Sequence, residues 1–240
     1  LLASALLLNR LLLPALKQLR QSVAKKARQG RGLLKTGRTH LMDAMPMTVE
    51  QELSGWQAQL DSAMQRLQDT GKRLLALPLG GTAVGTGVNA DPKMTVLACR
   101  ILSKNTGLRI TPAPNKFESM AAQEHLVDLS GQCNTLSVTL MKIANDLRWM
   151  NSGPLTGLAE AELPALQPGS SIMPGKVNPV IPEAVAMVCA QVMGNHTTIS
   201  IAGQSGSFQL NTMMPVIACN SIQNLNLLAN ACSHLAEKAI

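Results

Sequence analysis

The sequence predicts an all-α protein, an elongated central helical bundle of about five long helices, on three observations. Of its 240 residues, 46% are hydrophobic, which is enough to fill a sizeable core. Aromatic residues make up only 2% and Tyr is absent, while Leu, Ala, Met, Gln and Asn abound, so propensity favours helices. Polar and apolar residues nowhere alternate over a stretch long enough for a sheet of any size.

The first expected helix covers residues 1–29, with a kink at Pro14, and ends at the glycines of "RQGRG". Asn9, Arg10 and Pro14 interrupt its apolar opening before the ~20 residues that a membrane span needs. We therefore expect a buried helix, and no membrane partner.

A second long helix should begin at Thr48, which forms a capping box with Gln51, and stop near Pro78. A shorter helix is expected over 93–106, and a very long one over 117–150. In that long helix, apolar residues recur at alternating steps of three and four, as in a heptad seam: Leu129, Cys133, Leu136, Leu140, Ile143, Leu147 and Met150.

Two further helices, Pro182 to about Asn195 and Pro215 to about Lys238, are split by "GQSGSFQLN". Helices of about thirty residues are about 45 Å long at 1.5 Å per residue, which predicts an elongated bundle that assembles with copies of itself. No repeat or linker divides the chain, so residues 1–240 are interpreted as one domain.

The net charge of +7 is concentrated in residues 1–42, which hold nine Lys or Arg and no acidic residue. A basic helix could bind nucleic acid, but no aromatic residues interleave for base stacking, so we favour a solvated face or acidic partners. The five cysteines form no Cys-x-x-Cys pair, which predicts reduced, packed thiols in a reducing compartment. No histidines stand at metal-ligand spacing, so no metal is expected.

Three polar stretches with glycine lie between the helices, at 35–46, 78–92 and 167–183. The second has four glycines but lacks both nucleotide-binding patterns and a preceding strand, so it is interpreted as a tight chain reversal that needs positive φ. The third resembles a phosphate loop only superficially, because Val177 stands where a magnesium-binding hydroxyl is required.

Within the third stretch, Asn178 and Pro179 form an expected N-cap with Pro at N1. Lys176, Asn178 and free N–H groups would then meet at the positive end of a helix, where a small carboxylate or a phosphate can bind. Glu183 lies one to two turns into that helix and could orient a histidine from another segment. His40 in the first stretch is the most suggestive histidine, while His125, His196 and His234 are interpreted as structural.

Several motifs together resemble one family. "GSSIMPGKVNP" is similar to the signature loop of the fumarase/aspartase superfamily, and "GRTH", "LGGTAVGTG", "PNKFE", "MKIANDLRW" and "CAQVMGN" resemble its class II fumarase branch. The resemblance covers essentially all 240 residues in order. Aspartases usually carry Gln in place of His40, so that residue favours fumarase.

The resemblance implies reversible anti addition of water to fumarate to give L-malate, a step of the tricarboxylic acid cycle, without metal or organic cofactor. It implies a homotetramer whose sites draw loops from three subunits, in the cytoplasm, or in the mitochondrial matrix of a eukaryote. By motif position, Ser170 would be the base that removes the C3 proton of malate, and Lys176 and Asn178 would hold the carboxylate and stabilise an aci-carboxylate intermediate. His40, partnered by Glu183, would act on the water or hydroxyl, and Thr39 would contact substrate.

The chain departs from the family in places. The family's N-terminal domain, with its loops of the kinds "SG-x-Q-T-N-M-N" and "SS-x-D-x-x-P-T", and its small C-terminal domain have no counterpart in these residues. Met42 and Met45 replace residues that are commonly polar. Two alternatives stay open: an aspartate ammonia-lyase-like enzyme, and a truncated, non-catalytic helical oligomer.

Overall fold

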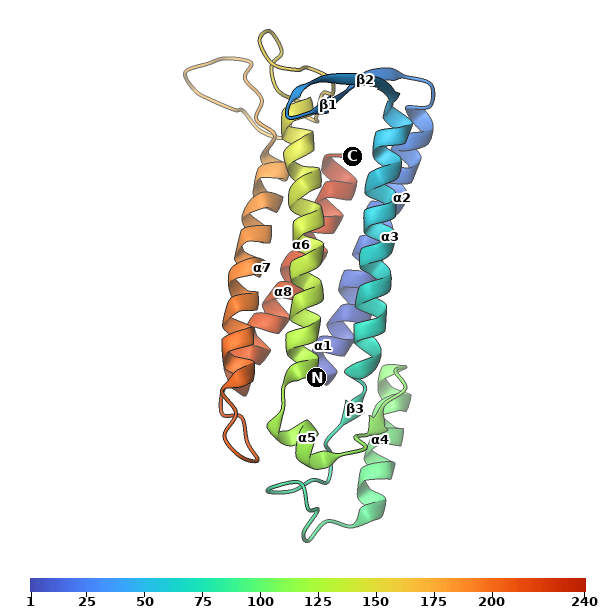
Figure 1. Cartoon of the computed structure of the whole chain (residues 1–240), viewed down its shortest axis with the longest axis vertical. Coiled ribbons are helices and arrows are strands. Elements are labelled where there is room, and N and C mark those ends of the chain that lie inside the picture. Colours follow the sequence, from blue (N-terminus) through green and yellow to red (C-terminus); the bar gives the residue numbers. More distant parts are fainter.

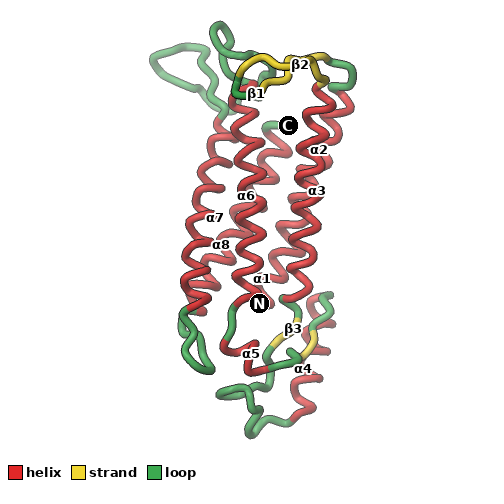
Figure 2. The backbone as a smooth tube through the Cα atoms, viewed as in Figure 1, coloured by secondary structure: helices red, strands yellow, loops and turns green.

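Five long helical runs lie side by side in the computed structural model, which describes residues 1–240 (Figure 1). The runs are α1 (Leu2–Leu7), which continues through a π-helical turn, η1 (Leu8–Leu12), into α2 (Leu13–Gln29), then α3 (Val49–Arg73), α6 (Glu124–Met150), α7 (Val180–Gln204) and α8 (Met214–Lys238). The predicted all-α bundle is confirmed. The tube in Figure 2 shows strands only at the two ends of the bundle.

The first run is continuous through Pro14, and its irregularity lies one turn earlier than the expected kink, at the π-helical turn Leu8–Leu12. Proline has no N–H and its ring crowds the preceding turn, so a widened turn before Pro14 accommodates it. By length and composition the stretch Leu2–Gln29 would suit a membrane span, despite its interruptions. Its inward-facing leucines Leu8, Leu12 and Leu16 are fully buried against other helices, as in a core helix.

The start of α3 is as predicted, because Thr48 and Gln51 form a complete capping box. The helix ends at Arg73, short of Pro78, and gives way to a two-residue strand, β3 (Ala76–Leu77). The expected helix over 93–106 is confirmed as α4 (Pro92–Thr106), capped by the Asp91 side chain.

The expected helix over 117–150 is two helices, α5 (Lys116–Ala121) and α6, separated by an extended Ala122. No glycine or proline marks this break in the sequence. The helix α7 runs nine residues beyond the expected end at Asn195, through a β-branched stretch of poor helix propensity. Burial of Ile199 and Ala202 in the core outweighs that propensity.

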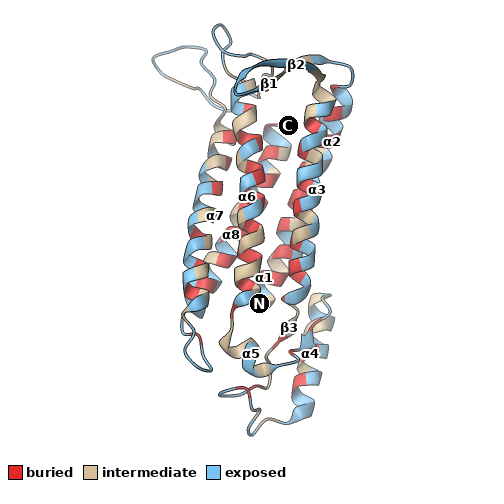
Figure 3. Ribbon diagram, in the orientation of Figure 1, coloured by how far each residue is buried: buried red, intermediate tan, exposed pale blue.

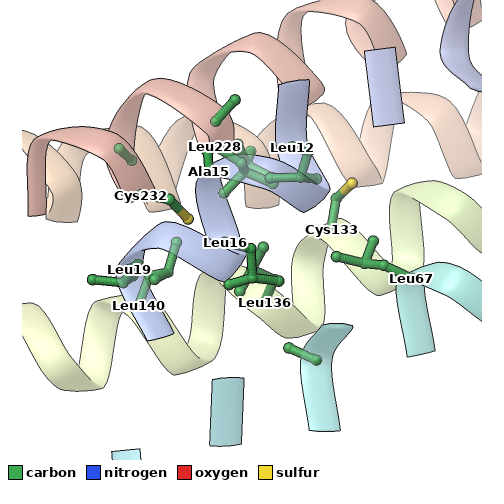
Figure 4. Packing of buried hydrophobic residues seen from close by; sticks show 14 of the residues in the cluster. Leu12, Ala15, Leu16, Leu19, Leu67, Cys133, Leu136, Leu140, Leu228 and Cys232 are labelled. Atoms are coloured by element: carbon green, nitrogen blue, oxygen red, sulfur yellow. The ribbon is translucent and has the colours of Figure 1, made fainter. Parts of the chain in front are cut away.

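The main core is one cluster of 35 buried residues drawn from all five runs. Every member of the predicted heptad seam is buried except Met150, which packs at its edge. Figure 4 shows Leu136 and Leu140 of α6 close to Leu16 and Leu19 of α2, and Figure 3 shows the buried residues on the inward sides of the helices. The spacing of these apolar residues therefore correctly predicts the face of α6 that is buried.

Four of the five cysteines are buried, but Cys219 is exposed, so the prediction of packed thiols is wrong for that residue. Burial raises the pKa of Cys133 and of Cys189 to about 12, which keeps both thiols protonated and unreactive near neutral pH.

The two ends of the bundle differ. Across one end lies an antiparallel hairpin, β1 (Leu34–Thr39) and β2 (Met42–Thr48), beside the long segment 151–179 (Figure 1). At the opposite end α4, α5 and the glycine-rich stretch 78–92 surround β3, which pairs in parallel with β4 (Thr111–Pro112). The first and third polar stretches thus share one end, and the second lies at the other.

Candidate active site

The stretch 35–46, expected to be a loop, forms most of the β1–β2 hairpin. Thr39 pairs with Met42, so His40 and Leu41 alone make the turn. Both residues have positive φ, 57° and 61° respectively. Two-residue turns with positive φ at both positions match the twist of a hairpin but normally use Asn or Gly, so this turn stores backbone strain at the candidate histidine.

His40 is exposed at the tip of the hairpin, and its neighbour Thr39 is exposed as well. The pairing shifts register between Thr36 and Arg38, next to Gly37, where a Cβ would come within 2.8 Å of the Met45 carbonyl oxygen. Glycine at 37 therefore lets the two strands approach closely just below the tip. The hairpin therefore leaves Thr39 and His40 exposed at its tip.

The signature loop closes on itself around Ser170. The Ser170 Oγ accepts hydrogen bonds from the N–H groups of Ile172 and Met173, at 3.1 and 3.3 Å. The Gly169 N–H donates to the Lys176 carbonyl at 2.9 Å, and the Asn178 side-chain Nδ2 donates to the Gly169 carbonyl at 3.2 Å. Ser170, Lys176 and Asn178 therefore belong to one closed loop.

A shallow cavity of about 360 Å³ is lined by residues 165–170 and 175–177, including Ser170 and Lys176. Most of this loop is exposed, so little apolar packing holds it in place. Such a loop can open and close at low cost, which suits a segment that admits substrate.

The prediction that Asn178 caps the following helix is wrong. Pro179 is the N-cap of α7, with no side-chain cap, because the Asn178 amide turns back to the Gly169 carbonyl. The Val180 N–H is already bonded to the Asn178 carbonyl, and Pro182 has no N–H. This helix start therefore offers fewer free donors to an anion than the sequence suggested.

Glu183 lies half-buried in the first turn of α7, and within this chain it makes no ion pair or side-chain hydrogen bond with His40. Their partnership stays a prediction. Among the other histidines, the ring Nδ1 of His196 lies 3.0 Å from the Ser130 Oγ between α7 and α6, a structural contact. No three His, Cys, Asp or Glu side chains converge in the structure.

The glycine-rich stretch 78–92 is a folded turn at the opposite end of the bundle from the β1–β2 hairpin and the segment 151–179 (Figure 1). Gly80, Gly85 and Gly87 have positive φ, which confirms the predicted chain reversal. The short strand β3 does precede this stretch, contrary to the expectation of none.

Sequence reasoning missed the ion pairs at the hairpin end, among them one that links the hairpin to the segment 151–179. Arg38 of the hairpin bonds Glu160 of the segment 151–179 at 2.5 Å, and so joins the two stretches that carry His40 and Ser170. Glu160 lies outside every motif, and nothing in the sequence pairs it with Arg38. Only the fold brings the two together.

Residues 2–194 match the family model described as "Lyase". The chain belongs to this lyase family. The class II fumarate hydratase of Xylella fastidiosa (strain Temecula1) is 62% identical to this chain over 229 residues, which are 95% of the chain and 48% of that protein. A second relative, fumarate hydratase class II 2 of Pseudomonas aeruginosa, is 53% identical over 238 residues, covering 99% of the chain and 52% of that protein.

The crystal structure of the class II fumarase from Schistosoma mansoni superposes on this chain with a TM-score of 0.96 at 39% identity, covering 98% of the chain and 52% of that structure. The resemblance read from the motifs is therefore confirmed. The chain spans about half the length of the curated relatives it matches, 48% of one and 52% of another.

Proposed function

We propose that this lyase contributes the signature loop and the histidine hairpin of a class II fumarate hydratase, which interconverts fumarate and L-malate. The observation that carries the proposal is the closed loop that gathers Ser170, Lys176 and Asn178, on a chain 62% identical to a fumarate hydratase of class II. The relatives named above are all fumarate hydratases, which favours this activity over that of an aspartate ammonia-lyase.

In this proposal the Ser170 alkoxide removes the C3 proton of L-malate. The electron pair of the broken C–H bond moves into the adjacent carboxylate and gives an aci-carboxylate. Lys176 and Asn178 stabilise this added charge, because a fixed cation and a fixed N–H donor cost little reorganisation as the charge develops.

The C2 hydroxyl then leaves as water with a proton from His40, while the electron pair returns to form the C2–C3 double bond of fumarate. Glu183, from the first turn of α7, would orient and stabilise the protonated imidazole, and Thr39 would contact the substrate beside His40. The reverse sequence hydrates fumarate. The chemistry we assign needs no metal or organic cofactor.

The assembly we propose is a homotetramer in the cytoplasm, in which neighbouring copies complete each site. Large apolar side chains are exposed along helices that no other part of this chain covers, among them Met94, Leu97 and Ile101 of α4 and Met187 of α7. Such side chains in number on one molecule mark surfaces that another protein covers.

The test replaces Ser170 by Ala in the full-length protein that contains this chain. We expect the rate of fumarate formation from L-malate, followed by absorbance at 240 nm, to fall roughly 10²- to 10⁴-fold, as for loss of a general base. Binding of a non-reactive dicarboxylate should persist, since Lys176 and Asn178 remain. Ser171→Ala is the matched control and should keep near-normal activity.

Two results would contradict the proposal. Full activity of Ser170→Ala would remove Ser170 as the base, and turnover of aspartate without turnover of malate would assign the chain to the ammonia-lyases.

A further inference from the structure

Four charged side chains form a compact cluster at the hairpin end, here called the ion-pair cluster: Lys35, Arg38, Glu52 and Glu160. The Lys35 Nζ lies 2.5 Å from a Glu52 oxygen and 3.0 Å from a Glu160 oxygen, and the Arg38 Nη1 lies 2.5 Å from the other Glu160 oxygen. Their side chains are only 9 to 21% exposed. Two cations and two carboxylates thus balance each other in a largely desolvated place.

The cluster joins three elements that are distant in sequence. Lys35 and Arg38 come from β1, Glu52 from the first turn of α3, and Glu160 from the segment between α6 and α7. The backbone of Glu160 is fixed, because its N–H and that of Ala161 both donate to the Met150 carbonyl, at 2.8 and 3.0 Å. The Glu160 carboxylate is therefore held at the end of a 27-residue helix.

The charges depend on one another. Burial by itself would raise the pKa of Glu160, but hydrogen bonds from Arg38 and Lys35 outweigh it and lower the pKa. Burial would likewise lower the pKa of Lys35, and its bonds to Glu52 and Glu160 raise it instead. Removing one member of a desolvated ion cluster leaves its partner charged and unpaired, which is costly.

Little else holds the hairpin tip. Residues 39–46 are all exposed, and no hairpin residue belongs to the hydrophobic core. A backbone bond from the Val49 N–H to the Leu33 carbonyl closes the base of the hairpin, at its far end from His40. Arg38 is two residues from His40, so its bond to Glu160 is the side-chain link to the rest of the molecule that lies nearest the tip.

We propose that Glu160 is a positioning residue, which holds the His40 hairpin against the end of α6 and so fixes it relative to the segment that carries Ser170. The effect of Glu160 on catalysis rests on the function proposed above, whereas its role in holding the hairpin does not. Asp43 provides an internal contrast, since it also faces Arg38 but at 3.9 Å and with 86% of its side chain exposed.

The experiment compares Glu160→Gln with the control Asp43→Asn by amide hydrogen exchange. Gln keeps the size of Glu but not its charge, so we expect exchange of the hairpin amides in residues 34–48 to rise roughly tenfold, as for loss of one charge-assisted bond. The interior of α6 and α8 should exchange at the normal rate, and Asp43→Asn should match the wild type. Glu160→Asp, which keeps the carboxylate, should recover part of the protection.

In the full-length enzyme, Glu160→Gln should lower kcat roughly tenfold and leave KM for malate within about twofold, because a misplaced acid slows proton transfer more than it weakens carboxylate binding. Wild-type exchange in Glu160→Gln, or equal effects of Glu160→Gln and Asp43→Asn, would overturn the proposal. Should Glu160→Gln lose its fold by circular dichroism, Arg38→Gln provides the same comparison from the other side of the bond. Exchange is measured without turnover, so failure of the fumarase assignment alone would leave the hairpin result intact.

Discussion

The helical bundle and the end that carries Ser170 and His40 are ordered by different interactions. In the bundle, leucines such as Leu16, Leu136 and Leu140 are fully buried in one apolar cluster. At the hairpin end, Leu155 and Ile172 are 93% and 86% exposed, and hydrogen bonds and ion pairs supply the order. Packed cores resist local opening, whereas polar loops open at low cost, so the candidate residues Ser170 and His40 lie where local movement costs little free energy.

The largest expected effect on stability comes from a change in the tightly packed helical bundle. Leu140→Ala empties a fully buried position of α6 in the main core, and should lower the free energy of unfolding by about 2–5 kcal/mol, from lost burial and the cavity left behind. Urea denaturation measures it. Leu155→Ala removes the same atoms at the exposed end and should change that free energy by less than about 0.5 kcal/mol. Similar losses in the two variants would show that the hairpin end is also held by apolar packing.

The helical bundle is also the region that the sequence predicts well. Spacing of three and four residues placed Leu129, Leu136 and Leu140 on one buried face, and the Thr48 capping box fixed the start of α3. These signals are local, because a helix face and a cap depend on residues within one or two turns. They predict the element and its inner side without knowledge of its neighbours.

The hairpin end was predicted less completely because its order comes from contacts between residues that are distant in the sequence. Motifs located Ser170, Lys176 and His40, but not the hairpin that carries His40, since a turn of His40 and Leu41 lacks the usual Gly or Asn. Asn178 has the residue type of a helix cap, yet its amide bonds the Gly169 carbonyl nine residues away in the chain. No local pattern marks Glu160, whose partners lie more than a hundred residues earlier.

An intermediate effect is expected in the loop around Ser170, where the backbone is tightly folded. A Cβ at position 169 would overlap the Lys176 carbonyl oxygen, to which the Gly169 N–H donates. Gly169→Ala should therefore cost about 1–3 kcal/mol locally and force the loop open. The free energy of unfolding should change by less than about 1 kcal/mol, because the loop opens without the bundle.

The consequence should appear in substrate binding. We expect KM for malate to rise roughly tenfold in the full-length protein, since Ser170 and Lys176 are no longer held in fixed positions relative to each other. Gly175→Ala is the control in the same loop: its φ is +80°, which strains an alanine, but nothing lies within 4 Å of the added carbon. If Gly175→Ala raises KM as much as Gly169→Ala, backbone freedom rather than the close approach to Lys176 governs the loop.

The smallest expected effect is a loss of stability in acid. It should occur at different carboxylates in the bundle and in the hairpin end. Asp128 of α6 accepts bonds from Arg73 at 2.8 Å and from Thr70 at 3.1 Å, both on α3. Burial would raise the pKa of Asp128, but these bonds and that from Gln132 lower it. A carboxyl whose pKa is lower in the folded state stabilises the fold above its unfolded value, about 4 for Asp, and that contribution fades as the pH falls through and below it.

Because the Arg73 and Asp128 side chains are 54% and 31% exposed, the loss should be no more than about 1 kcal/mol. Urea denaturation at pH 6 and pH 3 measures it, and Asp128→Asn should flatten that part of the pH dependence. The pKa of Glu160 is lowered too, but the loss of its charge in acid should affect the hairpin and not the bundle. The measurement is amide hydrogen exchange in Asp128→Asn, corrected for the intrinsic exchange rate at each pH. As the pH falls below about 4, the hairpin amides should lose protection while the amides of α3 and α6 keep theirs. If acid loosens the hairpin and the bundle together in that variant, the two regions unfold as one cooperative unit and the contrast between them fails.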